Sequence, residues 1–160
     1  MEKTINYTEI DNFIHRLDKE LSSLERTDKL LATVEQDLRQ SLNQIKNSDD
    51  KSKRKLAATI DDAYYTDVLA LDSSFHVRTM ALCNPVTSTA ILKKMTESSL
   101  QDQFTLMIIA HNPNTSTEIL NEIFTYGGDS GEIRNAILQN PNCNDVLRFK
   151  VEDWENQRID

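Results

Sequence analysis

Three Asn-Pro pairs, each 28 residues after the one before, constrain the fold of this chain more than any other feature. The pairs are Asn84-Pro85, Asn112-Pro113 and Asn140-Pro141, and they contain all three prolines of the chain. A proline ring crowds the preceding residue out of the α region, so each pair predicts the end of a helix. A fixed period of this size is typical of helical repeats that stack on one another. The sequence therefore predicts an all-α fold with helices ending at residues 83/84, 111/112 and 139/140.

A polar run and then an apolar pair follow each Asn-Pro corner. The apolar pairs are Ile91-Leu92, Ile119-Leu120 and Val146-Leu147. The polar runs offer N-cap side chains for a second helix, namely Thr87 or Ser88, Thr115 or Ser116, and Asn142 or Asn144. Each repeat is therefore predicted to be a helix, a corner and a second helix. One repeat cannot bury its own apolar stripe, but stacked neighbours can.

The repeated phrase, hydrophobic-Arg-x-x-Ala/Ile-Leu-x-Asn-Pro-x-Thr-x-x-x-Leu, resembles the leucine-rich repeat variant family. That family has short helical repeats that form a right-handed superhelix, similar in style to HEAT repeats. The resemblance covers about residues 67–151, and the matching residues are Val77, Arg78, Asn84, Pro85, Thr87 and Leu92, with Ile133, Arg134, Asn140, Pro141 and Leu147. The middle copy has Leu106 where the arginine belongs. The resemblance implies a short α-helical solenoid of about three repeats over residues 56–160. Nothing in this chain matches the cysteine cluster of the family's founding member, so no cofactor is expected.

Apolar residues recur every seven positions between residues 8 and 47, which predicts one long coiled-coil helix as the domain 1–47. The residues expected to pair with a second copy are Ile10, Leu17, Leu21, Leu24, Leu31 and Leu38. Two alternatives stay open: a hairpin that folds back near residues 26–28, and a helix packed on its own repeats. Residues 48–55 are expected to be a polar linker or a frayed helix junction, whose Lys51, Lys53, Arg54 and Lys55 are solvated or contact phosphate.

The formal net charge of −8 lies entirely on the repeats. Residues 1–55 contain 11 basic and 11 acidic side chains, whereas residues 56–160 contain 7 basic and 15 acidic ones. Such a field repels nucleic acid and attracts basic protein surfaces. No apolar run approaches the roughly 20 residues of a membrane helix, and the start lacks the apolar stretch of a secretory signal. We therefore expect a cytoplasmic location, with Cys83 and Cys143 as reduced thiols.

Catalytic and metal sites find little support in the sequence. The histidines are His15, His76 and His111, and no pair of them has the close spacing of metal ligands. Asp61 and Asp62 are adjacent, so in a helix they point in different directions and cannot face each other as acid and base. We expect no catalytic residue, no metal and no cofactor, and a small metal-dependent or hydrolytic enzyme is the least favoured function.

A partner-binding surface is predicted from the outward rows of the first helix in each repeat. These rows are His76, Thr79 and Cys83, then Phe104, Met107 and His111, then Glu132, Asn135 and Gln139. Phe104 and Met107 form the apolar centre, because exposed apolar residues with a polar rim mark interaction sites. The alternative is that they pack against the N-terminal helix. Two acids of the same repeat, Glu118 and Glu122, are expected to steer the partner.

These features favour a non-catalytic protein-protein interaction module. The N-terminal helix would make a homodimer, and the acidic repeats would dock a partner with a basic surface. Docking would inhibit a nucleic-acid-handling protein if the acids lay where phosphate otherwise binds. The alternative is a helical-repeat protein that itself binds nucleic acid, with the cluster at residues 51–55 supplying most of the contacts.

Overall fold

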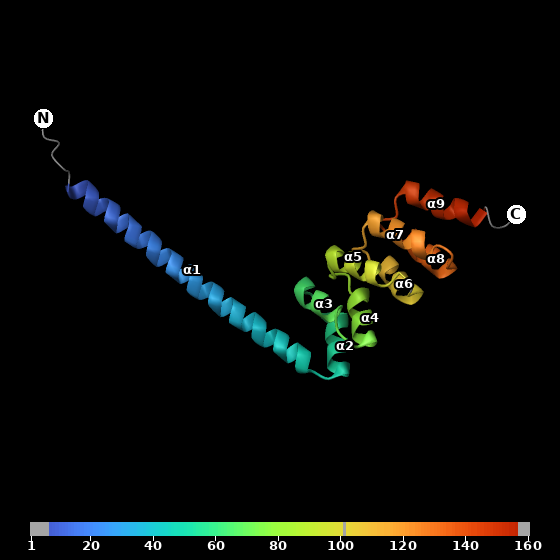
Figure 1. Ribbon diagram of the computed structural model, residues 1–160, viewed down its shortest axis with the longest axis horizontal. Coiled ribbons are helices and arrows are strands. Elements are labelled where there is room, and N and C mark those ends of the chain that lie inside the picture. The colour runs from blue at the N-terminus through green and yellow to red at the C-terminus, as the bar shows by residue number, and fades with distance from the viewer. Residues whose placement is uncertain (1–6, 101, 157–160) are drawn as a thin grey trace, which may run out of the picture. The chain divides into compact units, whose positions relative to one another are not determined.

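The computed structural model of the chain describes residues 7–100 and 102–156, apart from the side chains of residues 7–14, 17–18, 155 and 156. These residues form α-helices joined by turns and loops, with no β-strand among them, which confirms the all-α prediction. The chain divides into two compact units, residues 1–47 and residues 48–160 (Figure 1).

The described part of the first unit is one helix, α1 (Tyr7–Asn47), of 41 residues. It runs without a break through residues 26–28, so the alternative of a hairpin at that place is wrong. Most of its described leucines are exposed, Leu24 by 62% and Leu31 by 61%, whereas Leu42 is half-buried. Leu21 and Leu38 are exposed as well, while the side chains of Ile10 and Leu17 lie outside the described residues. The apolar stripe is therefore largely uncovered, and its pairing with a second copy stays a prediction.

The second unit begins with α2 (Asp50–Thr59), which replaces most of the linker predicted for residues 48–55. Asp49 caps this helix, because its carboxylate accepts a hydrogen bond from the Ser52 backbone N at 2.8 Å. Ala57 is fully buried, and α2 packs on α4 (Phe75–Cys83). The polar composition concealed this helix, since one face of it is charged while the other is packed.

The chain between residues 56 and 71 is not one continuous helix, because it is broken at residues 60–62. Its second part is α3 (Ala63–Leu69). Asp62 begins α3, because its carboxylate accepts from the backbone N of Tyr64 at 2.9 Å and of Tyr65 at 3.3 Å. The chain therefore turns between α2 and α3 without an Asn-Pro pair.

The remaining helices are α5 (Thr89–Ser98), α6 (Gln103–His111), α7 (Thr117–Gly127), α8 (Gly131–Gln139) and α9 (Asp145–Asn156). Helices α4, α6 and α8 end at Cys83, His111 and Gln139, which confirms the predicted ends. Helices α2, α4, α6 and α8 pack on one another in that order, and α5, α7 and α9 follow one another in a second row (Figure 1). Side chains between the rows form the core, including the fully buried Ile109, Leu120, Ile123, Ile137 and Leu147.

The asparagine of each Asn-Pro pair links its repeat to the preceding one. The Asn112 side-chain amide donates to the carbonyl oxygens of Leu82 at 2.8 Å and Asn84 at 2.9 Å. Asn140 repeats this pattern on Ala110 at 2.7 Å and Asn112 at 2.8 Å, and Asn84 bonds to the end of α2. These bonds satisfy carbonyl groups that a helix end leaves without a partner. We call this series of bonds the asparagine ladder.

The second helices are capped by the later of the candidate residues. The side chains of Ser88, Ser116 and Asn144 accept from the backbone N three residues on, at 3.2, 3.4 and 2.9 Å. Thr87 and Thr115 instead donate to backbone carbonyl groups in the last turn of the preceding helix, those of Ala81 and Ile109. The polar runs after the first two corners therefore serve two helices each, since one side chain closes the first helix and another starts the second.

Candidate interaction surface

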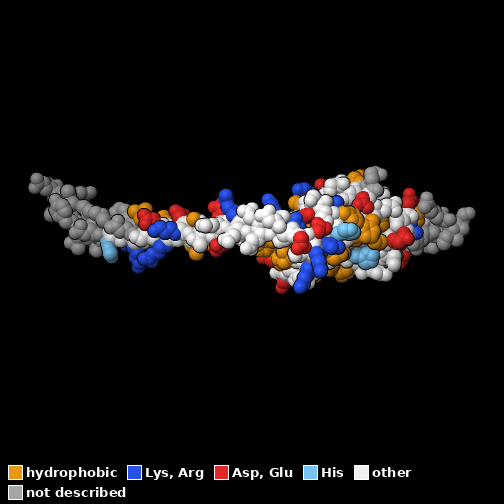
Figure 2. Space-filling model, turned by 90° about the horizontal axis from the view of Figure 1, so that it is seen from below, with side chains coloured by type: hydrophobic (Ala, Val, Ile, Leu, Met, Phe, Trp, Pro, Cys, Tyr) orange, Lys and Arg blue, Asp and Glu red, His pale blue; other side chains and the backbone are white. Residues whose placement is uncertain are grey.

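The outward side of α4 and α6 carries most of the apolar and histidine residues predicted to bind a partner. Phe104 is 48% exposed near the start of α6, and Met107 is half-buried one turn later. His76 and His111 are exposed, and Thr79 is half-buried. The Nδ1 atom of His111 lies 3.0 Å from the Met107 carbonyl oxygen, which orients the imidazole ring. Figure 2 shows histidine and hydrophobic side chains gathered on one face of the helical unit.

Phe75 belongs to this surface but was missed from the sequence. It is 41% exposed at the start of α4, and its ring centroid lies 5.7 Å from that of Phe104 and 5.7 Å from that of His76. The residues 28 and 56 positions later are Gln103 and Gly131, so comparison of the repeats offered no signal for an aromatic residue there. Phe75 and Phe104 thus form an exposed aromatic pair that bridges two neighbouring helices.

The surface becomes polar on α8. Glu132, Asn135 and Gln139 are all exposed, and the Gln139 amide donates to the Asn135 side chain at 3.0 Å. The Ser130 hydroxyl donates to the Glu132 carboxylate at 2.8 Å. Hydrogen bonds from the Glu132 backbone N and from Ser130 hold the pKa of Glu132 below its usual value. Glu132 is therefore ionised near neutral pH and adds a negative charge to the part of the surface on α8.

Glu118 and Glu122 belong to the other row of helices. Both lie on α7, where Glu118 is exposed and Glu122 is half-buried. A hydrogen bond with the Ser116 side chain lowers the pKa of Glu118, so it remains charged near neutral pH. The sequence grouped these acids with Phe104 and Met107 because they share a repeat, but the structure puts them on different helices. A partner that contacts Phe104 on α6 thus has to extend to α7 to meet them.

Residues of α2 and α4 form a shallow basic groove next to the aromatic pair. It is lined by Lys51, Arg54, Lys55, Ala58, His76 and Met80. Figure 2 shows Lys and Arg side chains beside histidine and hydrophobic ones on this unit. The sequence singled out the cations, but it gave no sign that α4 would add a histidine and a methionine to them.

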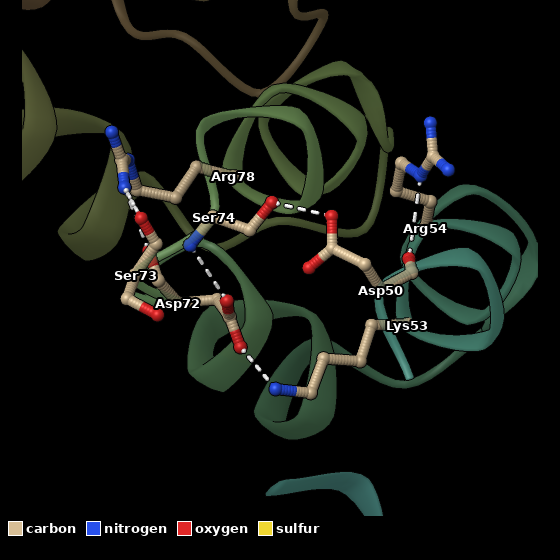
Figure 3. Close-up of polar contacts among 7 residues, drawn as sticks. All are labelled: Asp50, Lys53, Arg54, Asp72, Ser73, Ser74 and Arg78. Carbon is tan, nitrogen blue, oxygen red and sulfur yellow. Dashed lines mark hydrogen bonds and ion pairs between the residues drawn. The ribbon is translucent and has the colours of Figure 1, made fainter. Parts of the chain in front are cut away.

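Polar contacts lock α2 against the start of α4 (Figure 3). The Lys53 ammonium lies 3.0 Å from the Asp72 carboxylate, and the Ser74 hydroxyl donates to Asp50 at 2.8 Å. Burial alone would raise the pKa of Asp72. Hydrogen bonds from the Ser74 backbone N and from Lys53, with the charges of Lys53 and Arg78, instead hold that pKa below its usual value. Asp72 therefore stays ionised, which preserves its pairing with Lys53.

The two repeat arginines contact the connection before their own helix. The Arg78 guanidinium donates to the carbonyl oxygens of Asp72 and Ser73, each at 2.8 Å (Figure 3). The Arg134 guanidinium donates to the Gly128 carbonyl oxygen at 2.7 Å, and its Cζ atom lies 4.2 Å from the centre of the Trp154 ring. The Arg78 contacts hold the start of α4 in place, and the Arg134 contacts do the same for α8. The contact of Arg134 with Trp154 also ties α9 to α8.

The remaining candidates for chemistry are groups of metal ligands and the two thiols. No group of three or more His, Cys, Asp or Glu residues among them could hold a metal ion. A small pocket lined by Cys83, Ile108, His111 and Asn112 lies between α4 and α6. Burial raises the pKa of the Cys83 and Cys143 thiols, which disfavours their reactive thiolate forms.

Comparison with known proteins leaves the family open. No protein-family model matches the chain, and searches of curated proteins and of solved structures found no significant match. The resemblance to leucine-rich repeat variant proteins therefore stays a prediction. Among the described residues, no helix combines the length and the apolar character needed to cross a bilayer.

Proposed function

We propose that this chain is a non-catalytic protein-interaction module: a short α-solenoid of helical repeats that docks a partner protein. The ordered packing of α2, α4, α6 and α8 and the asparagine ladder support the solenoid interpretation. A likeness to leucine-rich repeat variant or HEAT-like repeats belongs to the same proposal. In this view α1 joins two copies of the chain through its exposed leucines.

The observation that carries the proposal is the exposed aromatic pair, Phe75 and Phe104. Large apolar side chains are usually buried in a monomer, and a cluster of them with a polar rim marks a contact surface. Here the rim consists of His76, Thr79 and His111. Aromatic residues near the centre of an interface often carry most of its binding energy.

The charge of the repeats favours a partner with a basic surface. Residues 56–160 contain 7 basic and 15 acidic side chains, and Glu118 and Glu132 are held in the charged form. The face of a phenyl ring also attracts Lys and Arg side chains of a partner. Proteins that handle nucleic acid carry basic surfaces, and occupation of such a surface by this module would inhibit them.

The test compares one core substitution with one double substitution on the surface, each made in the whole chain. Ile109 is fully buried, so Ile109→Ala should lower the free energy of unfolding by about 2–5 kcal/mol. Phe104→Ala with Met107→Ala should leave the melting temperature nearly unchanged but weaken capture of the basic proteins that the wild type retains from a native lysate. Mass spectrometry would quantify each captured protein.

Phe149→Ala is the matched control, because Phe149 is an exposed aromatic residue on α9, outside the proposed surface. It should capture the same proteins as the wild type. If the Phe104/Met107 variant is as unstable as Ile109→Ala, those residues belong to the core and the proposed surface is wrong. The proposal would also be wrong if the Phe104/Met107 variant captured the same proteins as the wild type.

A further inference from the structure

The basic groove is built by matching stripes on two helices. Lys51, Arg54, Lys55 and Ala58 stand at positions i, i+3, i+4 and i+7 of α2, so they share one face of that helix. His76 and Met80 are four residues apart on α4, so they share the facing stripe. The groove thus has cationic side chains from one helix and an imidazole and a thioether from the other.

The basic side chains of residues 51–55 have two different roles. Lys53 turns away from the groove and pairs with Asp72, and both side chains are largely buried, which fastens α2 to the rest of the unit (Figure 3). For the groove cations, no carboxylate of the described residues lies within ion-pair distance of Lys51, Arg54 or Lys55. The Arg54 Nε atom donates only to the Asp50 carbonyl oxygen, at 3.3 Å. The hydrogen bond from the Ser52 backbone N and, to a smaller extent, the charge of Arg54 lower the pKa of the Asp49 carboxylate, but the three cations share one face of α2 without an ion pair among the described residues.

We propose that this groove binds an acidic peptide segment of a partner protein. Its carboxylates would pair with the ammonium groups of Lys51 and Lys55 and with the Arg54 guanidinium, which can hold a carboxylate by two hydrogen bonds. Apolar side chains of the segment would cover Ala58, Met80 and the aliphatic stems of the lysines. The inference goes beyond the docking of a basic protein, because the ligand has the opposite charge and contacts α2.

The same cations would attract nucleic acid, but the surroundings favour a peptide. A nucleic acid strand is a long, regular polyanion, whereas α2 has ten residues and spans only about 15 Å. Beyond this short patch, the excess of acids in residues 56–160 repels phosphate. A peptide can place a few carboxylates in the groove and continue with neutral residues.

The experiment measures binding of a short fluorescein-labelled peptide of alternating Glu-Glu and Leu-Ala pairs to the full chain. The reference ligand is the same peptide with Gln in place of Glu. The wild type should bind the Glu peptide more tightly than the Gln peptide. Lys51→Gln, Arg54→Gln and Lys55→Gln together should reduce the affinity at least about tenfold, because charge-assisted hydrogen bonds are lost.

The matched control removes three exposed cations elsewhere, by Lys93→Gln and Lys94→Gln on α5 and Lys150→Gln on α9. It should bind the Glu peptide within about twofold of the wild type. The Phe104/Met107 variant should also bind it normally, so failure of this proposal is distinguishable from failure of the proposed function. Melting curves would show whether each variant is folded.

Amide chemical shifts of the wild-type protein provide a measurement that needs no variant. On titration with the Glu peptide, the shifts should change at Ala58, His76 and Met80. Equal binding of the Glu and Gln peptides would overturn the proposal, as would an equal loss of affinity in the control. Tighter binding of a single-stranded oligonucleotide that displaces the peptide would assign the groove to nucleic acid instead.

Discussion

Each asparagine of the ladder both closes a helix and ties it to the neighbouring repeat. Asn112 is only 2% exposed, and its side-chain oxygen accepts from the Asn114 backbone N at 2.8 Å while its amide donates to two carbonyl oxygens. All of its polar atoms are thus used. At α8, the Leu138 carbonyl oxygen accepts instead from the Arg148 guanidinium at 3.1 Å. One arginine therefore takes the place that the ladder gives to an asparagine in the earlier repeats.

Asn112→Ala tests the ladder. It would leave the buried Leu82 carbonyl group and the part-buried Asn114 backbone N without these partners, and a buried polar group that loses its partner costs about 1–3 kcal/mol. The Asn84 carbonyl would keep its bond from the Thr87 backbone N at 3.1 Å. We expect the free energy of unfolding, measured by urea denaturation, to fall by at least about 2 kcal/mol. Asn135→Ala, at an exposed site on α8, should change it by less than about 0.5 kcal/mol. Equal stabilities of the two variants would show that the ladder contributes nothing.

The heptad pattern of α1 and the exposure of its leucines both favour pairing of this helix with a second copy. Its apolar residues follow a heptad spacing, and most of the described leucines of that spacing are exposed. Ion pairs along a helix surface, such as Arg39 with Glu35 at 2.6 Å, contribute little when exposed. Burial of the leucines against a second copy would contribute much more, since each side chain fully buried adds about 1.5–3 kcal/mol.

Leu24→Glu together with Leu31→Glu should therefore convert a dimer into a monomer in analytical ultracentrifugation. The charges would lie in the seam, where their desolvation opposes pairing. Ser23→Glu with Gln40→Glu adds the same charge outside the heptad seam and should leave the dimer intact. A wild-type protein that already sediments as a monomer would contradict self-association through α1.

The basic groove and the acidic residues expected to contact a partner lie on different helices of the molecule. The basic groove lies on α2 and α4, whereas Glu118 and Glu122 lie on α7 and Glu132 lies on α8. A chain with this distribution can contact a basic surface and an acidic segment through largely different side chains, with His76 at the border of both. Charges at the edge of an interface act mainly on the rate of encounter.

Glu118→Gln with Glu122→Gln should accordingly slow association with the captured basic partner and reduce its dependence on salt, while dissociation changes little. Surface plasmon resonance over a salt series would measure both rates. Glu20→Gln with Glu25→Gln makes the same change in net charge on exposed residues of α1 and should have a smaller effect. If both pairs change the association rate equally, only the net charge matters and α7 is not the docking site.

The sequence by itself determined the helix ends and the repeat, because a proline restricts the residue next to it wherever the chain folds. The polar residues after each corner likewise act on backbone groups only a few positions away. Only the tertiary structure decided that the polar residues 50–55 belong to a packed helix, because the burial of Ala57 depends on α4. It also brought Phe75 beside Phe104 and His76 beside the lysines of α2. Those contacts join separate helices, and their geometry is set by packing between elements rather than by local propensity.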